Sequence, residues 1–233
     1  MNSSLWQGKQ NINYRKPISK NDSFDVVIIG AGFSGLWSAF HLKQFQPNLK
    51  IAVLEKEYVG FGASGRNGGW ASAEYPTSSN RLIKENGLES YKNLRTAITK
   101  SIDEIGEIAK SNNWQIDYAK GGALVFARGN AQLSRISKEI DEEHQLLNKS
   151  QTTELLNIPS ALGSVFTPHC AALNPFKLVR ALADHLEKIG VIIYEQSSVS
   201  EIRDKQVEVN GFNVSCTFSI RATEAFTPRK WMG

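Results

Sequence analysis

Cysteine is scarce in this chain. Its 233 residues include only two, Cys170 and Cys216, together with four histidines. Neither cysteine has a second cysteine or a histidine at metal-site spacing, although His169 adjoins Cys170. We therefore expect neither a structural metal site nor a disulfide framework. Cys216 lies in the alternating stretch NVSCTFSI, which predicts a buried strand position.

Long apolar runs and blocks of one charge are also missing. No stretch approaches the roughly 18 apolar residues that span a bilayer, and residues 1–23 form a polar tail without a signal-peptide core. Lys and Arg total 27 against 23 for Asp and Glu, and the excess is scattered. These absences argue against membrane insertion and against nucleic-acid binding. With a mean hydropathy of −0.31, they predict a globular cytoplasmic protein.

The first strong structural signal is the stretch FDVVIIGAGFSGLWSAFHL. Residues 24–29 are a continuous apolar run, which is typical of a strand buried on both faces of a parallel sheet. A glycine turn follows and leads into a helix that ends before Pro47. Residues 50–54 give a second apolar strand. This β-α-β order predicts the α/β fold class.

The glycine turn carries the pattern G-x-G-x-x-G at Gly30, Gly32 and Gly35. The first glycine permits a tight turn, the second lets a pyrophosphate approach the backbone, and the third lets helix and strand pack closely. A helix N-terminus at this position offers N–H groups and a partial positive charge to phosphates. We expect a dinucleotide pyrophosphate over these glycines and over Phe33 and Ser34.

Glu55 ends the second strand, at the distance from the glycines where dinucleotide-binding domains carry an acidic residue. A carboxylate there accepts hydrogen bonds from ribose hydroxyls and repels a 2′-phosphate, which disfavours NADP.

A second glycine-rich segment, GASGRNGG, spans residues 62–69. Its small residues permit close approach of a ligand to the backbone. Arg66 can offset phosphate charge, and Ser64 and Asn67 can donate hydrogen bonds. An extended dinucleotide with a bulky flavin needs such a second contact, so the segment favours FAD over NAD. The predicted cofactor-binding residues here are Ala63, Ser64, Gly65, Arg66, Asn67, Gly68 and Gly69.

The middle of the chain predicts mixed structure. A stripe of apolar residues indicates a long helix over 91–109, and residues 115–127 indicate two short strands around Gly121 and Gly122. A second stripe predicts a helix over 133–147. His144 falls on that stripe, and we expect it to have no catalytic part.

The end of the chain returns to an α-then-β order. Asn174 and Pro175 are a helix N-cap and first-turn proline, and Gly190 ends that helix before a strand over 191–196. Asn210 and Gly211 predict a hairpin turn.

Several segments together resemble the N-terminal half of the D-amino-acid oxidase-type FAD-dependent oxidoreductases, and most of all the gamma-glutamylputrescine oxidases. They are DVVIIGAGFSGLWSAFHL, VLEKEYVGFGASGRNGGW, GGALVFA and NPFKLVRALADHLEKIGVIIYE. The resemblance runs from about residue 24 to 228. It implies that FAD is the cofactor, with Glu55 on the adenosine ribose and the backbone of Val199 on the adenine. It also implies a cofactor contact near Ala222, in a stretch where Glu224 replaces the usual Asn.

The resemblance further implies a domain organisation. A Rossmann-like FAD/NAD(P)-binding domain would comprise residues 24–112 and 171–233 after the tail at 1–23, with residues 113–170 as the beginning of an inserted α+β substrate domain. Family members are considerably longer, and their substrate sheet and second glycine-rich segment have no counterpart here. We therefore expect a C-terminally truncated, incomplete FAD-binding domain.

These features support a FAD-dependent oxidoreductase that oxidises the C–N bond of a small amine or amino acid by hydride transfer to flavin. No side chain is assigned as catalytic. His169 is a candidate near the flavin, although a structural loop histidine is favoured. One alternative is an inactive nucleotide-binding fragment, or half of a split flavoenzyme completed by another chain. A further alternative, an NAD-dependent dehydrogenase, gives no role to GASGRNGG.

Overall fold

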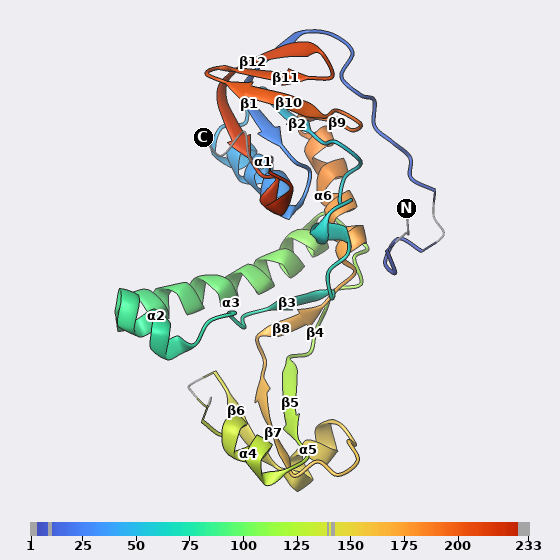
Figure 1. Ribbon diagram of the computed structural model, residues 1–233. Coiled ribbons are helices and arrows are strands. Elements are labelled where there is room, and N and C mark those ends of the chain that lie inside the picture. Colours follow the sequence, from blue (N-terminus) through green and yellow to red (C-terminus); the bar gives the residue numbers. More distant parts are fainter. Residues whose placement is uncertain (1–3, 9–10, 139, 141–142, 228–233) are drawn as a thin grey trace. The chain divides into compact units, whose positions relative to one another are not determined.

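The computed structural model describes residues 4–8, 11–138, 140 and 143–227. The chain folds as two compact units (Figure 1). The first unit comprises Met1–Gly68 and Asn174–Gly233, and the second comprises Gly69–Leu173. Because the chain leaves the first unit after Gly68 and returns to it at Asn174, the second unit is an insertion in sequence.

A six-stranded sheet forms the centre of the first unit, in the order β10-β11-β12-β1-β2-β9. Strands β12, β1, β2 and β9 run parallel, whereas β10, β11 and β12 form an antiparallel meander. The elements are β1 Asp22–Ile29, α1 Phe33–Phe45, β2 Ile51–Leu54, η1 Ala63–Gly65, α6 Pro175–Lys188, β9 Ile192–Tyr194, β10 Val199–Arg203, β11 Gln206–Val209, β12 Phe212–Arg221 and η2 Glu224–Phe226. The α/β fold class predicted from the sequence is confirmed.

Helices α1 and α6 pack against each other, with the rings of Phe40 and His185 5.7 Å apart. The contact between α1 and β1 is close because Gly35 has no side chain: a Cβ there would lie 2.1 Å from the Gly30 carbonyl oxygen and 3.2 Å from Ile28 Cγ2. Helix α6 begins as the sequence predicts, since the Asn174 side chain accepts a hydrogen bond from the N–H of Lys177.

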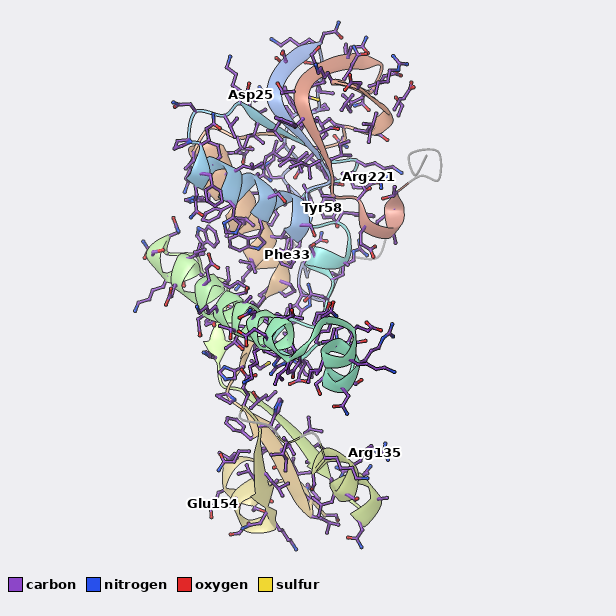
Figure 2. The ribbon with its side chains drawn as sticks, turned by 90° about the vertical axis from the view of Figure 1, so that its left-hand side faces the viewer. Asp25, Phe33, Tyr58, Arg135, Glu154 and Arg221 are labelled. Atoms are coloured by element: carbon purple, nitrogen blue, oxygen red, sulfur yellow. The ribbon has the colours of Figure 1, made fainter. Side chains whose placement is uncertain are left out.

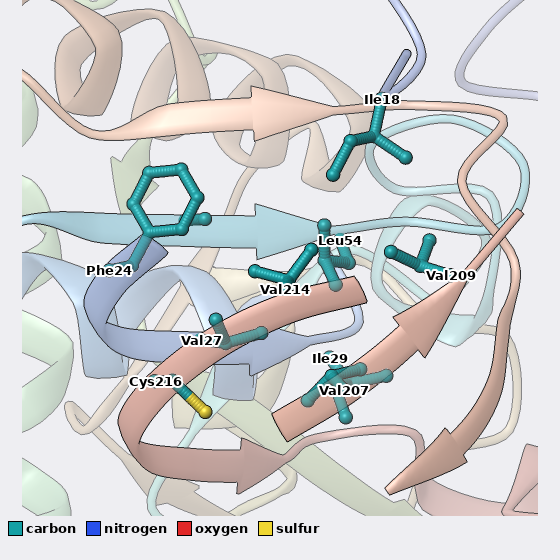
Figure 3. Close-up of a cluster of buried hydrophobic side chains, with 10 residues drawn as sticks. Ile18, Phe24, Val27, Ile29, Leu54, Val207, Val209, Val214 and Cys216 are labelled. Carbon is teal, nitrogen blue, oxygen red and sulfur yellow. The ribbon is translucent and has the colours of Figure 1, made fainter. Parts of the chain in front are cut away.

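The other face of the sheet carries a second apolar layer. Because side chains alternate along a strand, Val27 and Ile29 point away from Ile28 and join a buried cluster with residues of the meander (Figure 3). Ile18, from the segment before β1, is part of the same cluster. Cys216 is also in it, which confirms the buried strand position predicted for this cysteine.

The predicted hairpin is confirmed at the junction of β11 and β12. Val209 pairs with Phe212, and the two residues between them, Asn210 and Gly211, have φ values of 49° and 81°. Positive φ at both central residues gives the two-residue turn whose twist matches antiparallel strands.

The second unit contains two three-stranded sheets, in the orders β3-β8-β4 and β5-β7-β6, and four α-helices within its described residues. Its elements are β3 Trp70–Ser72, α2 Ser79–Asn86, α3 Leu88–Ser111, β4 Ala119–Lys120, β5 Ala123–Ala127, α4 Asn130–Ile136, β6 Gln145–Asn148, α5 Lys149–Leu155, β7 Gly163–Thr167 and β8 Cys170–Ala172. The long helix predicted over 91–109 and the two strands around Gly121 and Gly122 are confirmed as α3, β4 and β5.

The helix predicted over 133–147 is wrong. Helix α4 ends at Ile136, which packs with Leu133 on Ala127 and Val165, and the chain then forms strand β6 against β7. The apolar residues of the predicted stripe therefore belong to two elements. Residues 139, 141 and 142 of the predicted helix lie outside the described residues.

His144, which the sequence places on that helix, lies just before β6, and its Nε2 is 3.0 Å from Glu74 Oε1. Within the described part of the chain, no helix is long and apolar enough to cross a membrane.

Candidate functional site

A cavity of about 380 Å³ opens in the first unit, where the parallel strands β1, β2 and β12 end. This volume lies within the range of roughly 300–1,000 Å³ typical of small-molecule sites. Strand order reverses at β1, because β2 lies on one side of it and β12 on the other, and ligands of open α/β sheets bind at such points. The lining comprises residues 29–34, 54–57, 61–64, 197–199, 222–224 and Phe226.

Residues 30–34 of the glycine turn form one wall of the cavity. Phe33, which is labelled in Figure 2, is the first residue of helix α1. Gly30 has a φ of 106°, and a Cβ there would lie 2.5 Å from the Ala222 carbonyl oxygen. Gly32 lines the cavity, whereas Gly35 packs helix α1 on β1 and does not appear among the described lining residues. Gly30 and Gly35 therefore have the steric roles that the pattern predicts for them, and Gly32 lies at the cavity wall, where the pattern predicts that a pyrophosphate approaches the backbone.

The N-terminus of α1 faces this wall. The first N–H groups of a helix have no acceptor within the helix and carry a partial positive charge, which suits an anion. The first turn, residues 33–36, contains no acidic residue. The N–H of Phe33 donates to Ser64 Oγ at 2.8 Å, so the two glycine-rich segments meet directly. The Ser64 hydroxyl retains its own hydrogen to donate to a ligand.

Glu55 lies at the end of β2, partly buried in the cavity wall. Its Oε2 accepts from the N–H of Ala31 at 2.8 Å and its Oε1 from the N–H of Glu57 at 2.9 Å. Burial raises the pKa of this carboxyl above its ordinary value, outweighing the two N–H donors, which lower it. A carboxylate has about four acceptor positions, so Glu55 keeps capacity for further donors such as hydroxyls.

The second glycine-rich segment is only partly in the cavity. Ala63 and Ser64 line it. Gly65 packs against the backbone, since a Cβ there would lie 2.2 Å from the Gly60 carbonyl oxygen. The described lining residues include neither Arg66 nor Asn67.

Arg66 lies over the ring of Phe61, 4.7 Å from its centroid, and its Nε donates to the Phe61 carbonyl at 2.6 Å. Asn67 Nδ2 donates to the carbonyls of Ala63 and Ser64 at 3.3 and 3.1 Å. Both side chains thus hold the shape of the segment. Gly68 closes the first unit, and Gly69 opens the second, where its carbonyl accepts from the N–H of Leu173.

The far side of the cavity is formed by residues that follow strands β9 and β12. Val199 and Ala222, predicted from the family resemblance, both line it. Glu224 lines it too, with a φ of 45°. Among the described lining residues, the charged ones are Glu55, Lys56, Glu57 and Glu224.

Sequence reasoning missed Lys56, Phe61, Ser197, Ser198 and Phe226, which line the cavity. Ser197 and Ser198 come soon after a parallel strand ends, and that position could have identified them.

His169 belongs to the second unit and not to the lining of this cavity. Its Nδ1 is buried and has no hydrogen-bond partner among the described residues. Cys170 beside it is buried, and burial raises the pKa of its thiol. Within the described residues, no group of three or more His, Cys, Asp or Glu side chains is arranged to hold a metal ion.

Comparison with known proteins identifies the family. A family model described as FAD dependent oxidoreductase matches residues 25–232. The chain belongs to this family. The family resemblance seen in the sequence is confirmed, and so is FAD as the cofactor of the family, which leaves the NAD-dependent dehydrogenase without support.

Two curated relatives illustrate the position of this chain in its family. The probable oxidoreductase OrdL of Haemophilus influenzae is 31% identical over 197 residues, which cover 81% of this chain and 45% of the relative. Gamma-glutamylputrescine oxidoreductase of Escherichia coli is 28% identical over 195 residues, with 80% and 45% covered. The chain therefore spans less than half the length of these relatives.

Solved structures agree on the fold. Glycine oxidase from Bacillus cereus superposes with a TM-score of 0.68 at 22% identity, over 85% of this chain and 55% of that protein. L-amino acid deaminase from Proteus myxofaciens gives a TM-score of 0.71 at 17% identity, over 91% and 47%.

Proposed function

We propose that this chain binds FAD in the cavity of its first unit. One observation supports this most strongly: the glycine turn, Glu55 and Ser64 converge on one cavity at the carboxyl ends of parallel strands. The sequence predicts pyrophosphate or ribose binding for each of these groups. Membership of a family whose cofactor is FAD supports the same ligand.

In this proposal, different residues contact different parts of the cofactor. The N-terminus of α1, with Gly30, Gly32 and Ser64, holds the pyrophosphate. Glu55 accepts hydrogen bonds from the adenosine ribose, and the backbone at Val199 contacts the adenine. In this proposal the first unit carries the FAD-binding domain and the second unit carries the beginning of the substrate domain. The bounds differ from those predicted from the sequence: residues 69–112 of the predicted FAD-binding segment 24–112 lie in the second unit, together with the predicted substrate segment 113–170.

In this proposal, backbone N–H groups are the main contacts of the pyrophosphate. The charged side chains around the cavity are mostly acidic, and they would repel a diphosphate if they reached it. Backbone N–H groups and the helix dipole attract it without a side-chain cation. Gly30 and Gly32 matter for this reason: the positive φ of Gly30 shapes the turn, and the absence of a side chain at Gly32 lets the ligand come close to the backbone N–H groups.

We further propose that the whole protein oxidises a small amine or amino acid at a C–N bond. Relatives named for such substrates, gamma-glutamylputrescine oxidoreductase and peroxisomal sarcosine oxidase, support this substrate class. FAD supplies the acceptor for the hydride that leaves the carbon next to nitrogen. The chain itself binds and orients the nucleotide end of the cofactor.

The experiment that tests FAD binding is a titration of the purified chain, followed by the visible absorbance and fluorescence of the flavin. Gly32→Val places a branched side chain at the proposed pyrophosphate position, with its Cβ 2.9 Å from Ser64 Oγ. We expect it to abolish binding, because it fills that position and displaces Ser64. Gly121→Val is the matched control, since no described atom lies within 4 Å of its Cβ position and it belongs to the second unit. Equal FAD affinity of both variants and the unchanged chain would refute the placement.

A second candidate function is nucleotide binding by this chain without turnover. A related candidate is that this chain is half of a split flavoenzyme that a complementing chain completes. The cavity residues assigned above bind a nucleotide in the proposal, and none of them is assigned a catalytic role. Anaerobic addition of amines and amino acids to the flavin-loaded chain separates the two candidates. Bleaching of the bound flavin supports an oxidoreductase, whereas a stable spectrum supports nucleotide binding alone.

A further inference from the structure

Glu195 is a fully buried carboxylate that the proposed cofactor site does not use directly. Its Oε1 accepts from the N–H of Val59 at 2.9 Å and from Arg180 Nη1 at 3.0 Å. Arg15 binds it twice: the backbone N–H donates to Oε2 at 2.7 Å, and Nη1 lies 3.3 Å from Oε1. Buried charges are retained in proteins when they are paired in this way.

The hydrogen bond between the N–H of Val59 and Glu195 lies beside Gly60, which contacts both the glycine turn and the second glycine-rich segment. These are the two segments expected to contact FAD. Gly60, the next residue, donates to the carbonyl of Ala31 in the glycine turn at 3.2 Å. Gly60 also supports the second glycine-rich segment, because its carbonyl oxygen lies against Gly65. Glu195 therefore holds the backbone at Val59 and Gly60, immediately before that segment begins.

Arg15 connects this carboxylate to the beginning of the chain. Besides Glu195, its guanidinium contacts Asp184 at 2.5 Å and Glu187 at 2.8 Å on helix α6. Three residues later, the N–H of Ile18 donates to Ser197 Oγ at 3.0 Å, and the Ile18 side chain enters the apolar cluster of the sheet. This part of the predicted polar tail is thus bound along the first unit (Figure 1).

A second attachment lies on the glycine-rich segment itself. Trp6 Nε1 donates to the carbonyl of Asn67 at 2.7 Å. Gln7 Oε1 accepts from the hydroxyl of Tyr58 at 3.1 Å, and the rings of Tyr14 and Tyr58 meet edge to face with centroids 6.0 Å apart. Residues 4–8 and 11–18, called the strap below, therefore contact the segment at its far end and at its entry.

We propose that the strap positions the second glycine-rich segment for FAD, with Arg15 and Trp6 as its positioning residues. Neither residue lines the cavity as described, so both act through others: Arg15 through Glu195 and Val59, and Trp6 through Asn67. The cofactor part of this inference rests on the proposed FAD binding. The strap's effect on residues 57–68 does not depend on it.

The test compares Arg15→Gln and Trp6→Phe with the unchanged chain. Arg15→Gln removes one cation from a buried carboxylate, and Trp6→Phe keeps an aromatic ring while removing the N–H donor. Lys16→Gln is the matched control, because Lys16 is an exposed neighbour whose loss changes the net charge by the same amount. Hydrogen exchange of peptides covering residues 57–68 is measured without FAD, and the FAD dissociation constant is measured by titration.

We expect faster exchange over residues 57–68 in both variants, with exchange of β1 and β2 unchanged as the sign of an intact fold. We expect Arg15→Gln to weaken FAD binding about tenfold, the factor that a difference of about 1.4 kcal/mol produces. Trp6→Phe should weaken it less, because it removes one hydrogen bond near the surface. Lys16→Gln should change neither measurement.

Exchange over 57–68 that matches the unchanged chain in both variants would overturn the strap. Faster exchange with unaltered FAD affinity would overturn its role toward the cofactor. If the unchanged chain binds no FAD at any concentration, the proposed function fails, and the exchange measurement still decides whether the strap orders the segment. If Arg15→Gln fails to fold, Trp6→Phe decides both points.

Discussion

Burial and the proposed ligand have opposite effects on the protonation state of Glu55. Burial raises its pKa, and the negative neighbours Glu195 and Glu57 act in the same direction. A group whose pKa is raised in the folded chain stabilises the fold below its unfolded pKa, and this contribution is lost as the pH rises through the folded value. Ribose hydroxyls that donate to the carboxylate favour the ionised form. The unliganded fold and the ligand therefore prefer different protonation states.

A pH dependence of FAD affinity follows from Glu55. We expect binding to weaken as the pH falls through the raised pKa of this carboxyl, because the protonated group is a poorer acceptor. Glu55→Gln should bind FAD about tenfold less tightly above that pKa, a loss of roughly 1.4 kcal/mol, and its affinity should not vary across the same window. Titrations over a pH series check this. An identical pH profile in the variant would assign the dependence to another group.

Glu224 is a second residue whose chemistry can be tested. It brings a carboxylate to a cavity proposed to hold a diphosphate, and its φ of 45° is a conformation that Asn adopts more readily than most residues. Glu224→Asn should tighten FAD binding severalfold and raise the free energy of unfolding by up to about 1 kcal/mol, the order of the cost of a left-handed backbone for a residue that does not favour it. Titration and thermal unfolding check both. Weaker binding would show that Glu224 contributes a favourable contact.

At the scale of elements, the contact between α1 and the second glycine-rich segment matters most. Ser64 Oγ accepts the N–H of Phe33 at the helix start. Ser64→Ala removes that acceptor, and the loss of a capping oxygen costs about 1 kcal/mol of stability. We expect this decrease together with weaker FAD binding, both measured on the purified variant. Ser38→Ala is the control, because the hydrogen bond of Ser38 Oγ among the described residues goes to the Ser34 carbonyl one turn back in the same helix. Equal effects of the two changes would argue against a special role for Ser64.

Elements with a strong local signal could be predicted from the sequence. The buried strands β1 and β2, helix α6 with its Asn174 cap and Pro175, and the Asn210–Gly211 hairpin each have a local cause. Strand β6 could not be predicted, because Leu147 stands at a helical spacing from Ile136 but packs in a sheet with β7. A short strand whose partner lies elsewhere in the chain leaves little periodicity in its own sequence.

The candidate site shows the same division. The spacing of the glycines and of Glu55 predicts a nucleotide site because each position has a known steric or hydrogen-bonding role, and the structure brings both to one cavity. The charge of Arg66 predicts a phosphate partner, yet its guanidinium lies over the ring of Phe61. Composition indicates that a cation is present but does not say which neighbour it contacts.

At the scale of the whole molecule, contacts between distant parts of the chain could not be predicted. Arg15 meets Glu195 across 180 positions, and Ile18 meets Ser197 across 179. A polar segment before the first strand indicates a tail when read locally. Only the folded first unit brings α6 and the residues after β9 together and gives Arg15 its acidic partners.

A crystal structure of the chain with FAD would show where the cofactor binds. We expect electron density for the pyrophosphate over Gly30 and Gly32 at the start of α1, with the adenosine ribose within hydrogen-bond distance of Glu55. Density for FAD elsewhere on the chain, or for a nucleotide whose phosphates avoid the α1 N-terminus, would contradict the proposed site.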